Sequence, residues 1–202
     1  LCSEGAKVLV VACNTASGAS LEALRERLSI PVIGLEPALK PAVRESRNGR
    51  VGVMATRGTL RSARYARLVE NYGDGVQVVS NPCPGLADLV EEGVLGGPEL
   101  LARMREWVAP LRQAQVDTVV LGCTHYPFVR DTIAAALGPG VRLLDSGEAI
   151  ARRTAQVLAD AGALQPAGPG SFRFLTTGDP AEVRPVVERL WGGPVAVEHL
   201  EV

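Results

Sequence analysis

Short apolar runs alternate with amphipathic stretches along the whole chain. The apolar runs have the length of strands, and they predict strands at 8–12, 31–35, 51–55, 76–80, 117–121, 141–144, 172–176 and 195–198. Apolar residues at helical spacing, bounded by Gly, Pro and polar turns, predict helices at 16–28, 36–46, 59–72, 86–92, 99–113, 129–137, 148–161 and 180–190. Strands that alternate with helices in this way predict an α/β fold with mainly parallel sheets.

Two of the predicted strands end in the same manner. The run 117–121 is followed by Gly-Cys-Thr-His, with the thiol at Cys123, and the run 8–12 is followed by Cys13, Asn and Thr. Parallel sheets bind ligands at the carboxyl ends of their strands. The repeated arrangement therefore suggests two similar α/β halves, each delivering a cysteine to a cleft between them.

Two opposed thiols favour one kind of chemistry. A thiol has an unperturbed pKa of about 8.5, so it can serve as acid or base near neutral pH. Thiols on opposite faces of a carbanion would remove a proton from one side and return it on the other, which inverts a stereocentre without a cofactor. His125 could manage the proton of Cys123. A nucleophilic Cys–His pair is an alternative but leaves Cys13 idle, and a zinc site on Cys13, Cys123 and His125 lacks an evident fourth ligand.

The composition limits the binding partners and the cellular location of the protein. The chain has 202 residues and a net charge of −1, with both signs intermixed, so nothing indicates a nucleic-acid surface. Apolar runs are too short to span a membrane, and a reducing, cytoplasmic location fits four cysteines that show no metal-site or disulfide spacing. We expect Cys2 and Cys83 to be small buried residues without a catalytic role.

The motifs around the two cysteines resemble the signature motifs of glutamate racemases. They are Ala-Cys-Asn-Thr-Ala-Ser at 12–17 and Gly-Cys-Thr-His-Tyr-Pro at 122–127. Similar segments cover nearly the whole chain, at 31–34, 55–59, 145–150 and 174–179. The His-Tyr-Pro ending is similar to glutamate racemases, whereas aspartate racemases typically carry Glu after Cys-Thr.

The resemblance implies interconversion of L- and D-glutamate by two bases without a cofactor, with D-glutamate passing to peptidoglycan synthesis. Cys13 would act on D-glutamate and Cys123 on L-glutamate. The implied substrate contacts are Asn14, Thr15, Thr56, Thr59, Thr124 and His125. Thr56 and Thr59 could equally cap the helix beside them, and both roles can coexist. Relatives commonly form homodimers, although no interface can be derived from the residues.

The family pattern also implies a division of the chain. One α/β half would comprise residues 1–35 and 146–202, called the first half below, and the other would comprise residues 36–145, called the second half. The chain would cross between them near 34–37 and near 145–147, which could act as a hinge.

One departure from the family concerns the start of the chain. Relatives begin with a strand that ends in an Asp-Ser-Gly loop and carry a Pro-Tyr-Gly segment, and neither stands upstream of Cys13. We therefore expect residues 1–202 alone to be weakly active or inactive. Alternatives are another racemase of the group, acting on aspartate or a hydantoin, and an inactive binding module of the same fold.

Overall fold

The computed structural model describes residues 2–201, and every strand pairing in it is parallel. The strands are β1 (Leu9–Val11), β2 (Val32–Gly34), β3 (Arg50–Ala55), β4 (Gln77–Pro82), β5 (Thr118–Leu121), β6 (Arg142–Leu144), β7 (Phe174–Thr176) and β8 (Val197–His199). They form a four-stranded sheet in the order β4-β3-β5-β6 and two smaller sheets, β1-β2 and β7-β8. The predicted α/β class with parallel sheets is confirmed.

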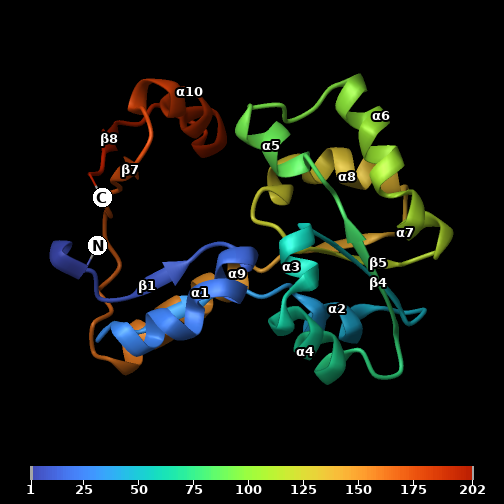
Figure 1. Cartoon of the computed structure of the whole chain (residues 1–202), viewed down its shortest axis with the longest axis horizontal. Coiled ribbons are helices and arrows are strands. Elements are labelled where there is room, and N and C mark those ends of the chain that lie inside the picture. The colour runs from blue at the N-terminus through green and yellow to red at the C-terminus, as the bar shows by residue number, and fades with distance from the viewer. Residues whose placement is uncertain (1, 202) are drawn as a thin grey trace.

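Helices connect the strands in nearly every interval of the chain (Figure 1). They are α1 (Asn14–Arg27), α2 (Leu39–Glu45), α3 (Arg57–Arg61), α4 (Ala63–Tyr72), α5 (Leu86–Glu91), α6 (Pro98–Trp107), α7 (Ala109–Gln113), α8 (Arg130–Leu137), α9 (Gly147–Asp160) and α10 (Pro180–Trp191), with 3-10 turns η1 (Cys2–Glu4) and η2 (Tyr126–Val129). Most predicted elements agree with these bounds to within two residues.

The helix predicted over 59–72 is in fact two helices, α3 and α4, which meet at Ser62. The Ser62 hydroxyl accepts a hydrogen bond from the amide of Tyr65 at 3.1 Å and donates one to the carbonyl of Thr59 at 2.7 Å. The same hydroxyl thus caps the start of α4 and closes the end of α3. The apolar spacing continues through the break, so the sequence pattern does not reveal it.

The helix predicted over 99–113 also divides, at Val108 between α6 and α7. Pro110 lies in the first turn of α7, where its missing N–H costs nothing. Inside a continuous helix it would remove a hydrogen bond and crowd the preceding turn. The chain therefore ends one helix and starts another around this proline.

The four-stranded sheet carries the core of the molecule. Alternate residues of its central strands face opposite sides, as in any pleated strand. Val119 and Leu121 pack with helices α5, α6, α7 and α8 on one face, while Val120 packs with α2 and α4 on the other. Because both faces are covered, the strand that leads to Cys123 is buried along its whole length.

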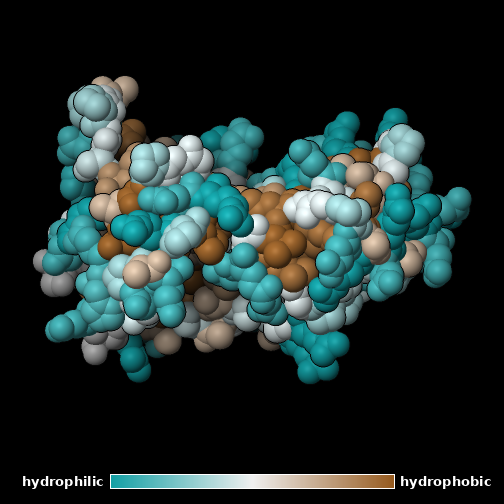
Figure 2. Space-filling model, turned by 90° about the horizontal axis from the view of Figure 1, so that it is seen from above, coloured by the Kyte–Doolittle hydropathy of each residue, from teal (hydrophilic) through white to brown (hydrophobic). Residues whose placement is uncertain are grey.

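The described part of the first half is packed much more thinly. Its buried hydrophobic residues are Leu21, Val32, Ile33 and Leu35, and every residue of α9 and α10 is at least partly exposed. In Figure 1, α1 and α9 lie along β1, whereas β7, β8 and α10 stand apart, with α10 facing α5. Seen from above, hydrophobic side chains gather near the middle of the surface between hydrophilic margins (Figure 2). Within residues 2–201, every helix is too short or too polar to cross a bilayer.

Candidate active site

Cys13 lies directly after β1 and caps the N-terminus of α1. Its backbone is extended, and its sulfur accepts a hydrogen bond from the amide of Ala16 at 3.4 Å. The side chain is partly exposed. The sulfur therefore stands at the positive end of a 14-residue helix, where backbone amides stabilise negative charge.

Cys123 lies directly after β5 and is buried, with 8% of its surface exposed. Its Sγ is 3.7 Å from Nδ1 of His125, whose Nε2 pairs with the carboxylate of Glu91 at the end of α5. The hydrogen bond to Cys123, supported by Glu91 and opposed by burial, raises the pKa of His125 to about 9. An imidazolium at neutral pH places a positive charge beside the sulfur.

The residues next to the two cysteines are bonded to each other. The buried side-chain amide of Asn14 donates a hydrogen bond from Nδ2 to the carbonyl of Gly122 at 3.0 Å. Gly122 leaves little room for a side chain, because a Cβ there would lie 3.0 Å from the carbonyl oxygen of Met54. Because each bonded residue adjoins a cysteine, the turns that carry Cys13 and Cys123 lie side by side.

A cavity of about 270 Å³ opens where these turns meet. Its wall includes Asn14, Cys123 and Thr124, and it continues past Leu35 and Ser146. Cys13 itself is not part of the wall, although its two neighbours in sequence are. The cavity is therefore adjacent to both cysteine motifs, and Cys123 is one of the residues that line it.

Asn14 has one polar atom left for a ligand. Only 6% of the residue is exposed, and its Oδ1 is buried without a hydrogen-bond partner among residues 2–201. A buried acceptor without a partner costs about 1–3 kcal/mol. Oδ1 is therefore a buried acceptor without a partner in a residue that lines the cavity.

Three of the predicted threonines form a cluster of hydroxyl groups beside this cavity. The Thr15 hydroxyl lies 2.8 Å from that of Thr56 and 2.9 Å from that of Thr59. Thr56 also caps α3, accepting the amide of Thr59 at 3.1 Å. The cluster joins the N-termini of α1 and α3, and its three residues are not in the cavity wall, unlike Thr124.

Comparison with known proteins decides the family. The model of the Asp/Glu/hydantoin racemase family matches residues 1–154. The chain belongs to this family. It is 43% identical to the glutamate racemase of Pseudomonas aeruginosa, covering 100% of this chain and 77% of that protein. It is 48% identical to that of Herpetosiphon aurantiacus, covering 90% and 72%.

A solved structure supports the same assignment. The glutamate racemase of Escherichia coli, in complex with L-glutamate and the activator UDP-MurNAc-Ala, superposes with a TM-score of 0.83 at 35% identity. The match covers 97% of this chain and 74% of that one. The racemase fold, two cysteine turns and a shared cavity therefore occur together.

Sequence reasoning missed Glu91 and misplaced one cysteine. Glu91 is far from Cys123 in sequence, in an ordinary helical stretch, and only the fold brings it to His125. Cys83 is buried as expected, and burial raises the pKa of its thiol to about 12, which keeps it protonated. The expectation of burial was wrong for Cys2, because the turn η1 places that residue on the surface ahead of β1.

Proposed function

We propose that this protein interconverts L- and D-glutamate by two-base catalysis, with Cys13 and Cys123 as the bases and without a cofactor. The observation that best supports this proposal is the Asn14–Gly122 hydrogen bond, which holds the two cysteine turns together beside one cavity. The identity with proteins named glutamate racemase, one of which binds L-glutamate in its solved structure, supports glutamate as the substrate.

The reaction needs one proton to leave and one to arrive. The thiolate on one face takes the proton from Cα, and the electron pair of the broken C–H bond remains on carbon as a carbanion. The thiol on the other face then donates its proton to that carbon. Cys13 would take the proton of D-glutamate and Cys123 that of L-glutamate, so each turnover leaves the thiol pair in the opposite protonation state.

The polar groups of the site suit an amino acid. The free Oδ1 of Asn14 can accept a hydrogen bond from the ammonium group. The hydroxyl of Thr124, which lines the cavity, can donate to a carboxylate, whereas the hydroxyls of Thr15, Thr56 and Thr59 bond one another outside the wall. His125, held by Glu91, adds positive charge beside Cys123, where it offsets the negative charge of the substrate and of the carbanion.

The biological setting belongs to the same proposal. D-glutamate formed in the cytoplasm would supply peptidoglycan synthesis, and the enzyme would work as a homodimer. The first and second halves would move about the two crossings near 34–37 and 145–147. Such a hinge would open the cavity to substrate and close it during proton transfer.

Separate Cys13→Ala and Cys123→Ala variants of the natural protein test the mechanism. Each should lower racemisation, followed by circular dichroism from either enantiomer, by more than about a thousandfold, because one of the two bases is missing. In D₂O, each should still exchange the Cα proton of one enantiomer more readily than that of the other. Cys2→Ala, which removes an exposed thiol, is the matched control and should racemise normally.

Three outcomes would contradict the proposal. A single-cysteine variant that racemises at the normal rate would exclude the two-base mechanism. If the unmodified protein racemised aspartate but not glutamate, the substrate would be aspartate and the proposed substrate would be wrong. Full loss of activity on removal of a cofactor would exclude cofactor-independent chemistry.

A further inference from the structure

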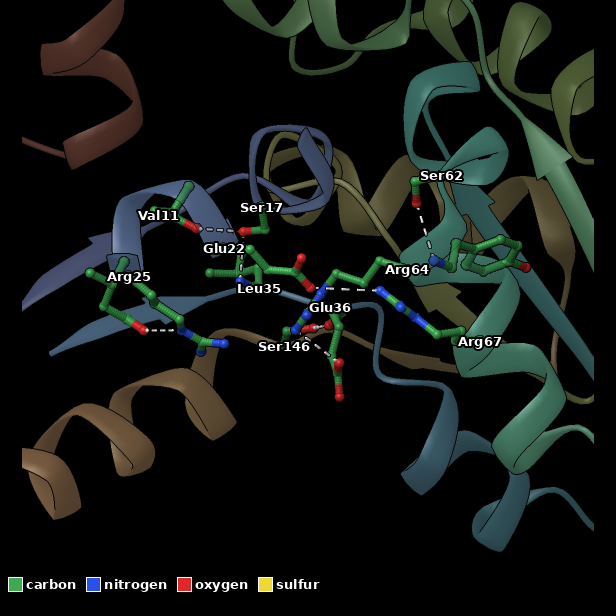
Figure 3. Close-up of polar contacts among 12 residues, drawn as sticks. Val11, Ser17, Glu22, Arg25, Leu35, Glu36, Ser62, Arg64, Arg67 and Ser146 are labelled. Carbon is green, nitrogen blue, oxygen red and sulfur yellow. Dashed lines mark hydrogen bonds and ion pairs between the residues drawn. The ribbon is translucent and has the colours of Figure 1, made fainter. Parts of the chain in front are cut away.

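Ser17 occupies an unusual position in helix α1, one turn after Cys13. Only 2% of the residue is exposed, and its hydroxyl makes two hydrogen bonds (Figure 3). It donates to the carbonyl of Val11 at 3.2 Å and accepts the amide of Leu35 at 2.9 Å. Neither partner belongs to α1, so the hydroxyl links the helix to the ends of two other segments.

This hydroxyl stands where the β1-β2 ladder would otherwise continue. Val11 and Gly34 are the last paired residues of the two strands. In a parallel ladder, the carbonyl of Val11 would next bond the amide of Leu35, and the Ser17 hydroxyl lies between these two groups. A Cβ on Gly34 would lie 3.1 Å from this hydroxyl oxygen, so the close approach of helix and strand depends on glycine there.

The two hydrogen bonds tie the Cys13 turn to both crossings. The amide of Ser17 donates to the carbonyl of Cys13 at 2.9 Å, which fixes the turn on one side. Leu35 begins the first crossing, and the next residue, Glu36, accepts a hydrogen bond at its carbonyl from the hydroxyl of Ser146 at 2.6 Å. Figure 3 shows Ser17, Leu35, Glu36 and Ser146 as this continuous series between the halves.

We propose that Ser17 is a positioning residue for racemisation, which holds the Cys13 thiol in place relative to the half that carries Cys123. This role rests on the two-thiol function proposed above. Ser17 is not in the cavity wall, so it acts through the Cys13 turn and not on the substrate.

The expected effect is specific to one proton transfer. Without the hydroxyl, the buried amide of Leu35 loses its partner, and the carbonyl of Val11 is left with its bond from the amide of Cys13 at 2.8 Å, so the turn can shift. A displacement of about 1 Å can slow a reaction about a hundredfold. Asn14 still bonds Gly122, so substrate contacts persist and the change falls on proton transfer at Cys13.

Ser17→Ala tests this role, with Ser20→Ala as the control. Ser20 lies on the same helix, and its hydroxyl bonds only the carbonyl of Ala16 one turn back. Ser17→Ala should lower kcat by about ten- to a hundredfold and change KM by less than about threefold. The isotope effect with Cα-deuterated D-glutamate should rise and that with deuterated L-glutamate should fall, because transfer at Cys13 becomes limiting. Ser20→Ala should match the unmodified protein.

A second pair of variants covers the case in which Ser17→Ala does not fold. Ser17→Thr and Ser17→Val have nearly the same shape and differ in the hydroxyl group. The Thr variant should retain more activity than the Val variant by at least about tenfold. Equal activity of this pair, or of Ser17→Ala and Ser20→Ala, would overturn the positioning role while leaving the racemase function intact.

Hydrogen exchange separates failure of this inference from failure of the proposed function. The Leu35 amide should exchange faster in Ser17→Ala than in Ser20→Ala, whether or not the protein acts on glutamate. Unchanged exchange at Leu35 would contradict the link itself. An unmodified protein without racemase activity would overturn the proposed function, and the positioning role of Ser17 with it.

Discussion

The two halves hold their cysteines in different ways. Cys123 belongs to a hydrophobic cluster that includes Leu121, Tyr126 and Val129, beneath a sheet covered on both faces. Cys13 lies in a half with few buried hydrophobic residues among those described, and individual hydrogen bonds fix its turn. One thiol is therefore positioned by packing and the other by a small number of polar contacts.

This difference predicts different responses to substitution. Dense packing transmits any loss of volume to the stability of the whole half. A turn held by hydrogen bonds changes little in total stability when one bond is lost, yet it can move by a fraction of an ångström. In the second half, core substitutions should therefore lower stability, whereas near Cys13 polar substitutions should lower activity first.

The largest expected effect on stability lies under the four-stranded sheet. Leu111 is fully buried against Gly52, where its Cδ2 lies 3.0 Å from a Cβ placed on that glycine. Leu111→Ala should lower the free energy of unfolding by about 2–5 kcal/mol, because it leaves a cavity. Leu158→Ala, at a partly exposed position in α9, should cost less than about 1.5 kcal/mol. Urea denaturation of both variants measures the difference, and equal losses would refute the contrast in packing.

The sequence predicted the strands and their catalytic ends well because buried parallel strands are continuous apolar runs. It did not predict the break at Ser62, since helical spacing continues through it, and it missed the break at Val108, which Pro110 signals in the sequence. Nor could it predict which atom of Asn14 would be free. The residue type allowed substrate contact, but only the fold shows that Nδ2 is occupied by Gly122 and Oδ1 is not.

The next largest effect on stability concerns the contact between the two cysteine turns. In Asn14→Asp the side chain keeps its shape, but a carboxylate cannot donate to the carbonyl of Gly122. Two buried acceptors would then face each other, and the free energy of unfolding should fall by about 1–3 kcal/mol. Thermal unfolding at neutral pH measures this loss. Asn48→Asp, at an exposed asparagine whose Nδ2 donates to the carbonyl of Gln115, is the control and should cost much less.

A smaller effect should appear in the pH dependence of stability. The pKa of His125 is raised to about 9 by the hydrogen bond to Cys123 and, to a smaller extent, by Glu91, so these interactions stabilise the folded state fully below pH 6.5. That contribution should fade as the pH rises through 9, because the imidazolium loses its proton. Glu91 is well exposed, so the loss in Glu91→Gln should be only about 1 kcal/mol. Unfolding at pH 6 and pH 10 tests this: the variant should be less stable at pH 6 and equal at pH 10.

The smallest effect on stability should come from the contact between α10 and the second half. Arg189 donates from Nη1 to the carbonyl of Gly93 at 2.6 Å, just beyond the C-terminus of α5, and Leu190 packs against the core cluster. Arg189→Ala should lower stability by less than about 1 kcal/mol, since the side chain is largely exposed. Because α10 has little other burial, its amides should nevertheless exchange faster with solvent. Arg184→Ala, on an exposed position of the same helix, should leave the exchange unchanged, and identical exchange in both variants would show that the Arg189 hydrogen bond does not hold α10 in place.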